Sequence, residues 1–143
     1  MPARDVSAAA IIERLAEISP VAKHWDMQVL EAEQGMVHMA MTVRADMTNT
    51  QGNCHGGVIF SLADFCFGFA ANSYNDRAVA ASCDIKFLKP AAVGDRLFAK
   101  TAEIWKQGRS GLYDVTVTNQ DGETIAVLRG HSRLVGGRHI EGR

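Results

Sequence analysis

The chain has 143 residues, of which 47% are hydrophobic and 22% charged, and this composition indicates one globular domain and excludes a disordered chain. A formal net charge of −1 argues against nucleic acid as the main partner, because nucleic-acid-binding domains usually carry a strong basic excess. The N-terminus lacks the basic-then-apolar pattern of a signal peptide, and no apolar run reaches membrane-spanning length, so no membrane partner is expected.

The first predicted element is a helix over about residues 7–18, with apolar residues at helical spacing and Ser7 as its N-cap. Ser19-Pro20 then predicts a short helical turn through Trp25, because proline fits the first position of a helix.

Two strands are predicted between Met27 and Val43, interrupted at Gln34-Gly35, and the second alternates apolar and polar residues. A polar loop over 44–54 leads into a helix of about 55–74. After it the hydrophobic period changes to two, which predicts four strands joined by turns: 78–88, 95–106, 111–119 and 124–135. A single antiparallel sheet curling around one central helix accounts for this order.

We expect residues 1–143 to form one domain. Residues 140–143 match a protease recognition sequence used in recombinant expression, so they are left out of the fold prediction. The three cysteines, Cys54, Cys66 and Cys83, have no paired spacing and are expected to be reduced in a cytoplasmic protein. The histidines do not fall at metal-ligand spacing, so neither a metal nor another cofactor is expected.

One carboxylate stands in the most apolar stretch of the chain. The predicted helix is apolar on every side around Asp64, which is the pattern of a helix enclosed by other structure. Asp64 has no Lys or Arg near it in the sequence, and burying an unpartnered carboxylate costs several kcal/mol. Two interpretations stay open: the fold supplies hydrogen bonds to a structural acid, or Asp64 reacts.

Two glycines, Gly56 and Gly57, stand where this helix begins. A helix start presents free backbone N–H groups at the positive end of the helix dipole, and glycine lets another group approach them closely. Such a start can bind an anion, or a carbonyl oxygen that becomes negative during a reaction. The alternative is a tight turn that binds nothing.

Gly56 and Asp64 are eight residues apart, which separates them by ~12 Å along the axis of one helix. One reacting carbonyl therefore cannot contact both. Two antiparallel copies of the helix, side by side, would bring Gly56 of one subunit near Asp64 of the other. If the two residues cooperate, the protein is at least a homodimer with sites at the interface.

The motif at this helix resembles that of the hotdog-fold thioesterases, and within them the PaaI-type phenylacetyl-CoA thioesterases. It reads Asn49-x5-His55-Gly56-Gly57-x4-Leu62-Ala63-Asp64, between two strands and a run of four. Three further stretches support the resemblance, which extends from about Trp25 to Gly137: Phe87-Leu88-Lys89-Pro90, Gln107-Gly108 and Leu128-x-Gly130.

The resemblance implies an α+β hotdog fold, in which an antiparallel six-stranded sheet wraps around a long central helix, in homodimers or dimers of dimers. It implies that the Gly56 N–H polarises a thioester carbonyl, while Asp64 of the neighbouring subunit attacks that carbonyl or activates water. Asn49 would orient water or carboxylate, and His55 would support the helix start. The implied reaction is hydrolysis of an acyl-CoA substrate to free acid and CoA, with aryl groups such as phenylacetyl or hydroxyphenylacetyl favoured.

Other residues are candidates for binding the substrate. Gly57 lies at the helix start, and three aromatic residues are expected near the acyl site: Trp25, Phe65 and Phe69. Arg109 and Ser110 occupy a hairpin tip where a guanidinium and a hydroxyl can meet a phosphate, and Lys89 ends the preceding strand. The alternative is that these charged side chains are only exposed to solvent and bind no substrate.

Three other functions compete with thioester hydrolysis. A hotdog dehydratase would need a catalytic His and acid placed differently, because the His55-Gly56-Gly57 sequence here lies at the helix start. A Cys–His hydrolase is disfavoured, because the adjacent residues Cys54 and His55 rarely face each other productively. A non-catalytic acyl-CoA-binding or sensor protein stays open, and Asp64 discriminates against it, since a binding module has no use for an unpaired acid at the carbonyl.

Overall fold

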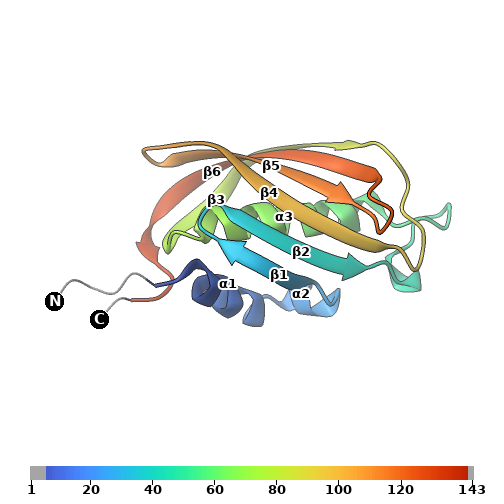
Figure 1. Cartoon of the computed structure of the whole chain (residues 1–143), viewed down its shortest axis with the longest axis horizontal. Helices are drawn as coiled ribbons and strands as arrows, with labels where there is room; N and C mark the ends of the chain where they lie inside the picture. The colour runs from blue at the N-terminus through green and yellow to red at the C-terminus, as the bar shows by residue number, and fades with distance from the viewer. Residues whose placement is uncertain (1–5, 142–143) are drawn as a thin grey trace.

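The computed structural model describes residues 6–141, and its first elements are two short helices (Figure 1). Helix α1 (Ala8–Glu17) begins at Ser7, whose hydroxyl accepts a hydrogen bond from the amide of Ala10 at 3.2 Å. Helix α2 (Pro20–His24) has proline at its first position. Both predicted helices are thus confirmed. No helix within residues 6–141 is long and apolar enough to cross a membrane.

The strands form one six-stranded sheet in the order β1-β2-β4-β5-β6-β3, with every neighbouring pair antiparallel. A short 3-10 turn, η1, and the long helix α3 separate the first two strands from the other four. The remaining elements are β1 (Gln28–Glu33), β2 (Met36–Thr42), η1 (Ala45–Met47), α3 (Gly56–Asn72), β3 (Asp76–Phe87), β4 (Arg96–Gln107), β5 (Ser110–Thr118) and β6 (Thr124–Arg138).

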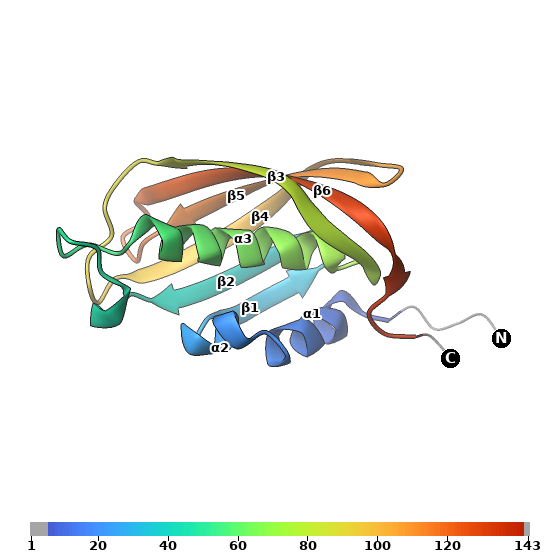
Figure 2. The ribbon, with the colours of Figure 1, turned by 180° about the vertical axis from the view of Figure 1, so that it is seen from behind.

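Helix α3 crosses the concave face of this sheet, with α1 and α2 lying beside it along β1 (Figure 2). The apolar residues that alternate along β2, including Val37, Met39 and Met41, are buried beneath α3 as their spacing predicts. The sheet also closes tightly on the helix from β6: a Cβ atom added to Gly130 would lie 2.7 Å from the Phe67 ring. The hotdog architecture expected from the resemblance is confirmed.

One expectation about α3 is wrong for the single chain. The helix was predicted to be enclosed on every side, but a stripe along it stays only half-buried, made up of Ser61, Asp64, Phe65, Gly68 and Asn72. The sheet covers the opposite face, which holds the fully buried residues. Hydrophobicity alone cannot distinguish a helix face that packs against the sheet of its own chain from an apolar face that packs against another molecule.

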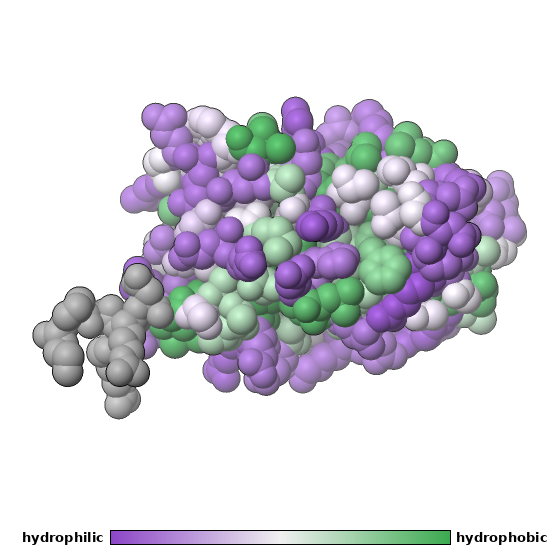
Figure 3. Space-filling model, in the orientation of Figure 1, coloured by the Kyte–Doolittle hydropathy of each residue, from purple (hydrophilic) through white to green (hydrophobic). Residues whose placement is uncertain are grey.

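The strand β3 forms one edge of the sheet, and its centre carries no charge. Four consecutive residues, Val79 to Ser82, are exposed there. On the face of the molecule seen in Figure 3, hydrophobic residues are dispersed among hydrophilic ones. An exposed edge strand whose centre is uncharged is a template for pairing with another strand.

Candidate active site

The start of α3 is fixed by His55. His55 is the N-cap, and its Nδ1 atom accepts a hydrogen bond from the Gly57 amide at 2.8 Å. The backbone amide of His55 donates to the carbonyl of Met47 at 2.7 Å, which ties the helix start to η1. The ring therefore supports the turn, as the resemblance implied, and it occupies the Gly57 N–H that was a candidate for binding substrate.

The amide of Gly56 is left free by this cap. It donates to no acceptor among residues 6–141. A Cβ atom added to Gly56 would lie 3.2 Å from Cζ of Phe87, so the glycine also makes room for that ring. An unused N–H at the positive end of a 17-residue helix is a suitable donor for a carbonyl oxygen that gains charge.

Asn49 shapes the loop beside Gly56. Its Oδ1 atom accepts from the amides of Gln51 at 2.9 Å and Asn53 at 3.1 Å, which closes an Asx turn. Its Nδ2 group has no acceptor within the described part of the chain, so it can still donate to a water molecule or a carboxylate.

These groups line a pocket of about 340 Å³, here called the amide groove. Its walls are the loop before α3 and the end of β3, and its lining includes Asn49, Cys54, Gly56, Phe87, Leu88 and Lys89. Phe87 and Leu88 are 51% and 61% exposed, so this groove has an uncovered apolar rim. Burial raises the pKa of the Cys54 thiol to about 11, which keeps it protonated and speaks against a Cys54 nucleophile.

Asp64 lies in the middle of α3 without a cationic partner. It forms no ion pair with any other described residue, and the Sγ atom of Cys83 lies 4.0 Å from its Oδ1. Burial raises the pKa of the Asp64 carboxyl above its ordinary value. Burial and the Asp64 charge together raise the pKa of the Cys83 thiol. A half-buried, poorly solvated carboxylate of this kind is a strong base and nucleophile for its type.

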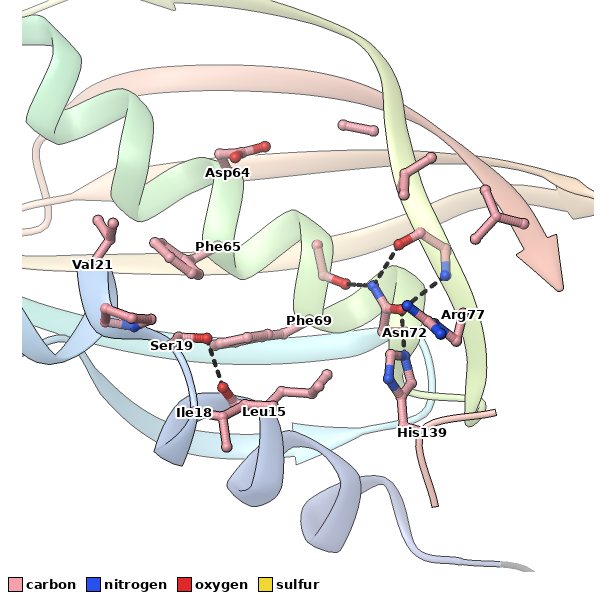
Figure 4. Close-up of a pocket in the computed structure, with 16 residues that line it drawn as sticks. Leu15, Ile18, Ser19, Val21, Asp64, Phe65, Phe69, Asn72, Arg77 and His139 are labelled. Atoms are coloured by element: carbon pink, nitrogen blue, oxygen red, sulfur yellow. Dashed lines mark hydrogen bonds between the residues drawn. The ribbon is translucent and has the colours of Figure 1, made fainter. Parts of the chain in front are cut away.

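Asp64 opens into a second pocket of about 510 Å³, here called the acid groove, which runs between α3, β3 and the two short helices. Figure 4 shows Phe65 and Phe69 projecting from α3 toward Ser19 and Leu15. Four further lining residues are large, apolar and about half exposed: Ile18, Val21, Val79 and Val135. The acid groove is therefore lined mainly by apolar side chains, with the Asp64 carboxyl among its few polar groups.

Gly56 and Asp64 do not share a groove. Gly56 lines the amide groove and Asp64 the acid groove, and neither pocket contains both residues. This separation agrees with the helix arithmetic, because two residues ~12 Å apart on one helix cannot contact the same carbonyl.

The candidate CoA-binding residues also lie in two separate parts of the structure. Lys89 lines the amide groove, where it pairs with Glu123. Arg109 and Ser110 lie at the β4–β5 turn, where the Arg109 carbonyl accepts from the Leu134 amide at 2.8 Å. Since Leu134 pairs with Ala78 near the other end of β3, this turn and Phe87 are about 30 Å apart along the strand. One CoA phosphate cannot meet Lys89 and Arg109 of the same chain.

Trp25, a further aromatic candidate, lies outside the acid groove, with the Arg44 guanidinium 5.3 Å from its ring centroid. Three polar groove residues were missed from the sequence: Asn72, Arg77 and His139. Arg77 on β3 and His139 directly after β6 reach α3 only in the folded chain. Within residues 6–141 no group of three His, Cys, Asp or Glu side chains is placed to hold a metal ion.

Comparison with known proteins decides the family. The model of the thioesterase superfamily matches residues 51–126, which include α3 and the strands β3 to β5. The chain belongs to the thioesterase superfamily. The predicted resemblance is confirmed, and with it the expectation of a thioesterase-family enzyme.

Within this superfamily the chain is similar to the acyl-coenzyme A thioesterase PaaI of Escherichia coli K12, with 43% identity over 81% of this chain and 83% of that protein. The solved structure of E. coli PaaI, from the phenylacetic acid degradation operon, superposes with a TM-score of 0.90 at 37% identity, covering 92% of this chain and 95% of that one. A Streptococcus mutans protein solved with acetyl-CoA gives a TM-score of 0.76 at 29% identity, covering 78% and 90%.

Proposed function

We propose that this thioesterase hydrolyses aryl-acyl-CoA thioesters, such as phenylacetyl-CoA, to the free acid and CoA. The observation that carries the proposal is the half-buried Asp64, which forms no ion pair with any other described residue and lines a largely apolar groove. Burying a carboxylate there costs free energy of folding, and a catalytic role explains why an acid stands at this position. The similarity to an acyl-CoA thioesterase supports the substrate class.

In the proposed reaction the thioester lies between two subunits. The Gly56 N–H of one subunit donates to the carbonyl oxygen and stabilises the negative charge that forms on it. Asp64 of the other subunit either attacks the carbonyl carbon directly or removes a proton from the attacking water. If Asp64 attacks, the C–S bond breaks, CoA leaves and takes up a proton from solvent, and a water molecule then hydrolyses the mixed anhydride formed on Asp64, which releases the acid and restores the carboxylate. If Asp64 is the base, the water oxygen bonds to the carbonyl carbon, the C–S bond breaks, and CoA leaves as a thiol with the proton that Asp64 removed, while the acyl group leaves as the acid. Asn49 supports this step through its free Nδ2 donor.

The acyl group would occupy the acid groove beyond Asp64. Phe65 and Phe69 lie 5.6 Å apart between ring centroids and form an aromatic wall there. A benzene ring packed on this wall gains apolar burial and edge contacts that an acetyl group cannot make. We therefore expect aryl groups to be preferred over short chains.

A homodimer follows from the same arrangement. The uncharged, exposed centre of β3 can pair with β3 of a second copy, and the half-buried stripe of α3 lies on the adjoining face. Such pairing would cover the open side of both grooves. A dimer of dimers stays part of the proposal, as does a cytoplasmic location, which the three free cysteines support.

We expect Lys89, which lines the amide groove, to contact the CoA part of the substrate where it leaves that groove. Arg109 and Ser110 would contact the same CoA only from another subunit. The binding-module alternative keeps these contacts but predicts no turnover.

The decisive experiment measures thiol release from a panel of CoA thioesters carrying phenylacetyl, acetyl and long-chain acyl groups. Phenylacetyl-CoA should give the highest kcat/KM, by about 10²-fold over acetyl-CoA. A higher rate with acetyl or long-chain groups would contradict the aryl preference. Tight CoA binding without any thiol release would replace the enzyme with the binding module.

A further inference from the structure

Lys89, the cation at the rim of the amide groove, is already paired within its own chain. Its Nζ atom forms an ion pair with Oε2 of Glu123, the residue immediately before β6. The two segments are also joined through their backbones, because the Lys89 amide donates to the carbonyl of Ile125 at 3.2 Å. The side chains of Lys89 and Glu123 are 47% and 42% exposed, so a ligand can reach both. The proposed reaction assigns no role to Glu123.

The Glu123 carboxylate is held in place by the turn between β5 and β6. Its second oxygen, Oε1, accepts from Nδ2 of Asn119 at 3.1 Å, and Asn119 is a buried residue. Oδ1 of Asn119 accepts from the amides of Asp121 and Glu123, each at 3.0 Å, which fixes the turn. Because the carboxylate is already ordered, little further side-chain entropy is lost on its side when it pairs with Lys89.

The charges around this ion pair are acidic. Hydrogen bonds from the Ala92 amide and the Gln120 side chain lower the pKa of Asp95, and the charge of Lys89 lowers it further. Asp95 is therefore ionised at pH 7 and interacts with the same ammonium group as Glu123. Lys89 is the only cation among the described residues that line the amide groove. An anion arriving at this rim thus meets one cation whose charge is already compensated.

We propose that Glu123 sets the affinity of the enzyme for CoA, because a CoA phosphate must displace this carboxylate before it can pair with Lys89. A phosphate group carries the same sign of charge as Glu123 and offers several acceptor oxygens, so it competes for the same ammonium group. The ion pair re-forms when CoA leaves, so it opposes binding and favours product release. This inference rests on the proposed function, in which Lys89 contacts the CoA part of the substrate.

The test measures the dissociation constants of CoA and of pantetheine, the phosphate-free thiol end of CoA, by calorimetry. Glu123→Gln removes the charge and keeps the oxygen that accepts from Asn119, so the turn should stay folded. This variant should bind CoA about fivefold more tightly than the wild type, which is the effect expected from one exposed ion pair. Pantetheine has no phosphate to pair with Lys89, so both proteins should bind it equally.

Two further variants show whether the gain comes from freeing Lys89. In a Lys89→Met background, Glu123→Gln releases no cation, so its gain in CoA affinity should fall below about twofold. Asp121→Ser is the matched control, because it removes an equal charge from the same turn and Asp121 has no ion-pair partner among residues 6–141. Its affinity for CoA should stay within about 1.5-fold of the wild type.

Weaker CoA binding by Glu123→Gln would overturn the inference, because Glu123 would then position Lys89 for the phosphate. An unchanged affinity, or an equal gain for pantetheine or in Asp121→Ser, would overturn it as well. None of these results bears on the hydrolysis, which thiol release from phenylacetyl-CoA measures separately. If the wild type neither binds CoA nor releases thiol, the proposed function fails, and this inference fails with it.

Discussion

Gly56 and Asp64 share one helix, yet they line different grooves of the chain, the amide groove and the acid groove. The helix rise keeps them ~12 Å apart, so no movement of side chains alone lets both contact one carbonyl. In the proposed reaction, each chain therefore carries both Gly56 and Asp64 but cannot bring the two together at one carbonyl. The exposed β3 edge, next to both grooves, is where a second chain can complete them.

The first prediction concerns pH. Burial raises the pKa of Asp64, and the carboxyl must be ionised to act as base or nucleophile. Activity should therefore be lost on acidification at a pH above the ordinary aspartate pKa of about 3.9. The acid limb of a kcat/KM profile measures this. A limb at or below the ordinary value would contradict the role of Asp64.

Stability should respond to the same carboxyl with the opposite sign. Because the folded-state pKa of Asp64 is raised, the folded chain binds this proton more tightly than the unfolded chain. The carboxyl's contribution to stability is thus lost as the pH rises through the raised pKa, and at pH 7 the charge destabilises the fold. Asp64→Asn should raise Tm by about 2–4 °C at pH 7 while activity falls.

The control for this prediction is Asp84→Asn, which removes an exposed carboxylate of β3 that pairs with Lys86. Its Tm should stay close to that of the wild type. The gain in Asp64→Asn should also shrink as the pH falls toward the Asp64 pKa. An equal Tm change in both variants would show that Asp64 is not destabilising.

The third prediction tests the β3 edge. Ala81→Lys places a charge in the exposed, uncharged centre of this strand. In a pair of β3 strands it would face a like charge near the two-fold axis, so the protein should become monomeric and lose most of its activity. Light scattering and thiol release measure both effects. Leu30→Lys, at an exposed position of the opposite edge strand β1, should leave the dimer intact. An active monomer would refute the shared site.

Most of the fold could be predicted from the sequence, because its signals are local. The change of hydrophobic period after Asn72, the cap at Ser7 and the turn residues placed the helices and strands within a few residues of their observed ends, while the 3-10 turn η1 lies in a stretch predicted to be loop. The strand β6 runs to Arg138, three residues beyond the predicted end, because Asp76 of β3 still pairs with it there.

The site could be predicted only in part. Gly56, His55 and Asp64 lie on or beside one helix, so their spacing in sequence fixed their spacing in space. Arg77 and His139 both reach the acid groove only through the pairing of β3 with β6, and no local pattern marks them. Lys89 and Arg109 were both candidates for binding CoA, but no local pattern shows that the sheet topology places them near opposite ends of β3.

The most direct test of the central claim, that each site takes Asp64 from one subunit and Gly56 from the other, mixes two inactive variants. Asp64→Asn removes the base. Gly56→Pro removes the N–H and preserves the helix start, since proline suits the first position of a helix and His55 already has the extended backbone that precedes proline (φ −61°, ψ 135°). Gly56→Ala is the matched control, because it adds the same contact with Phe87 but keeps the N–H, and it should retain most activity.

Equal amounts of the two inactive variants, unfolded and refolded together, should regain about one quarter of wild-type thiol release, because half of the dimers are mixed and each mixed dimer has one intact site. If the mixture stays as inactive as its parents, although mixed dimers have formed, Gly56 and Asp64 do not act across the subunit interface.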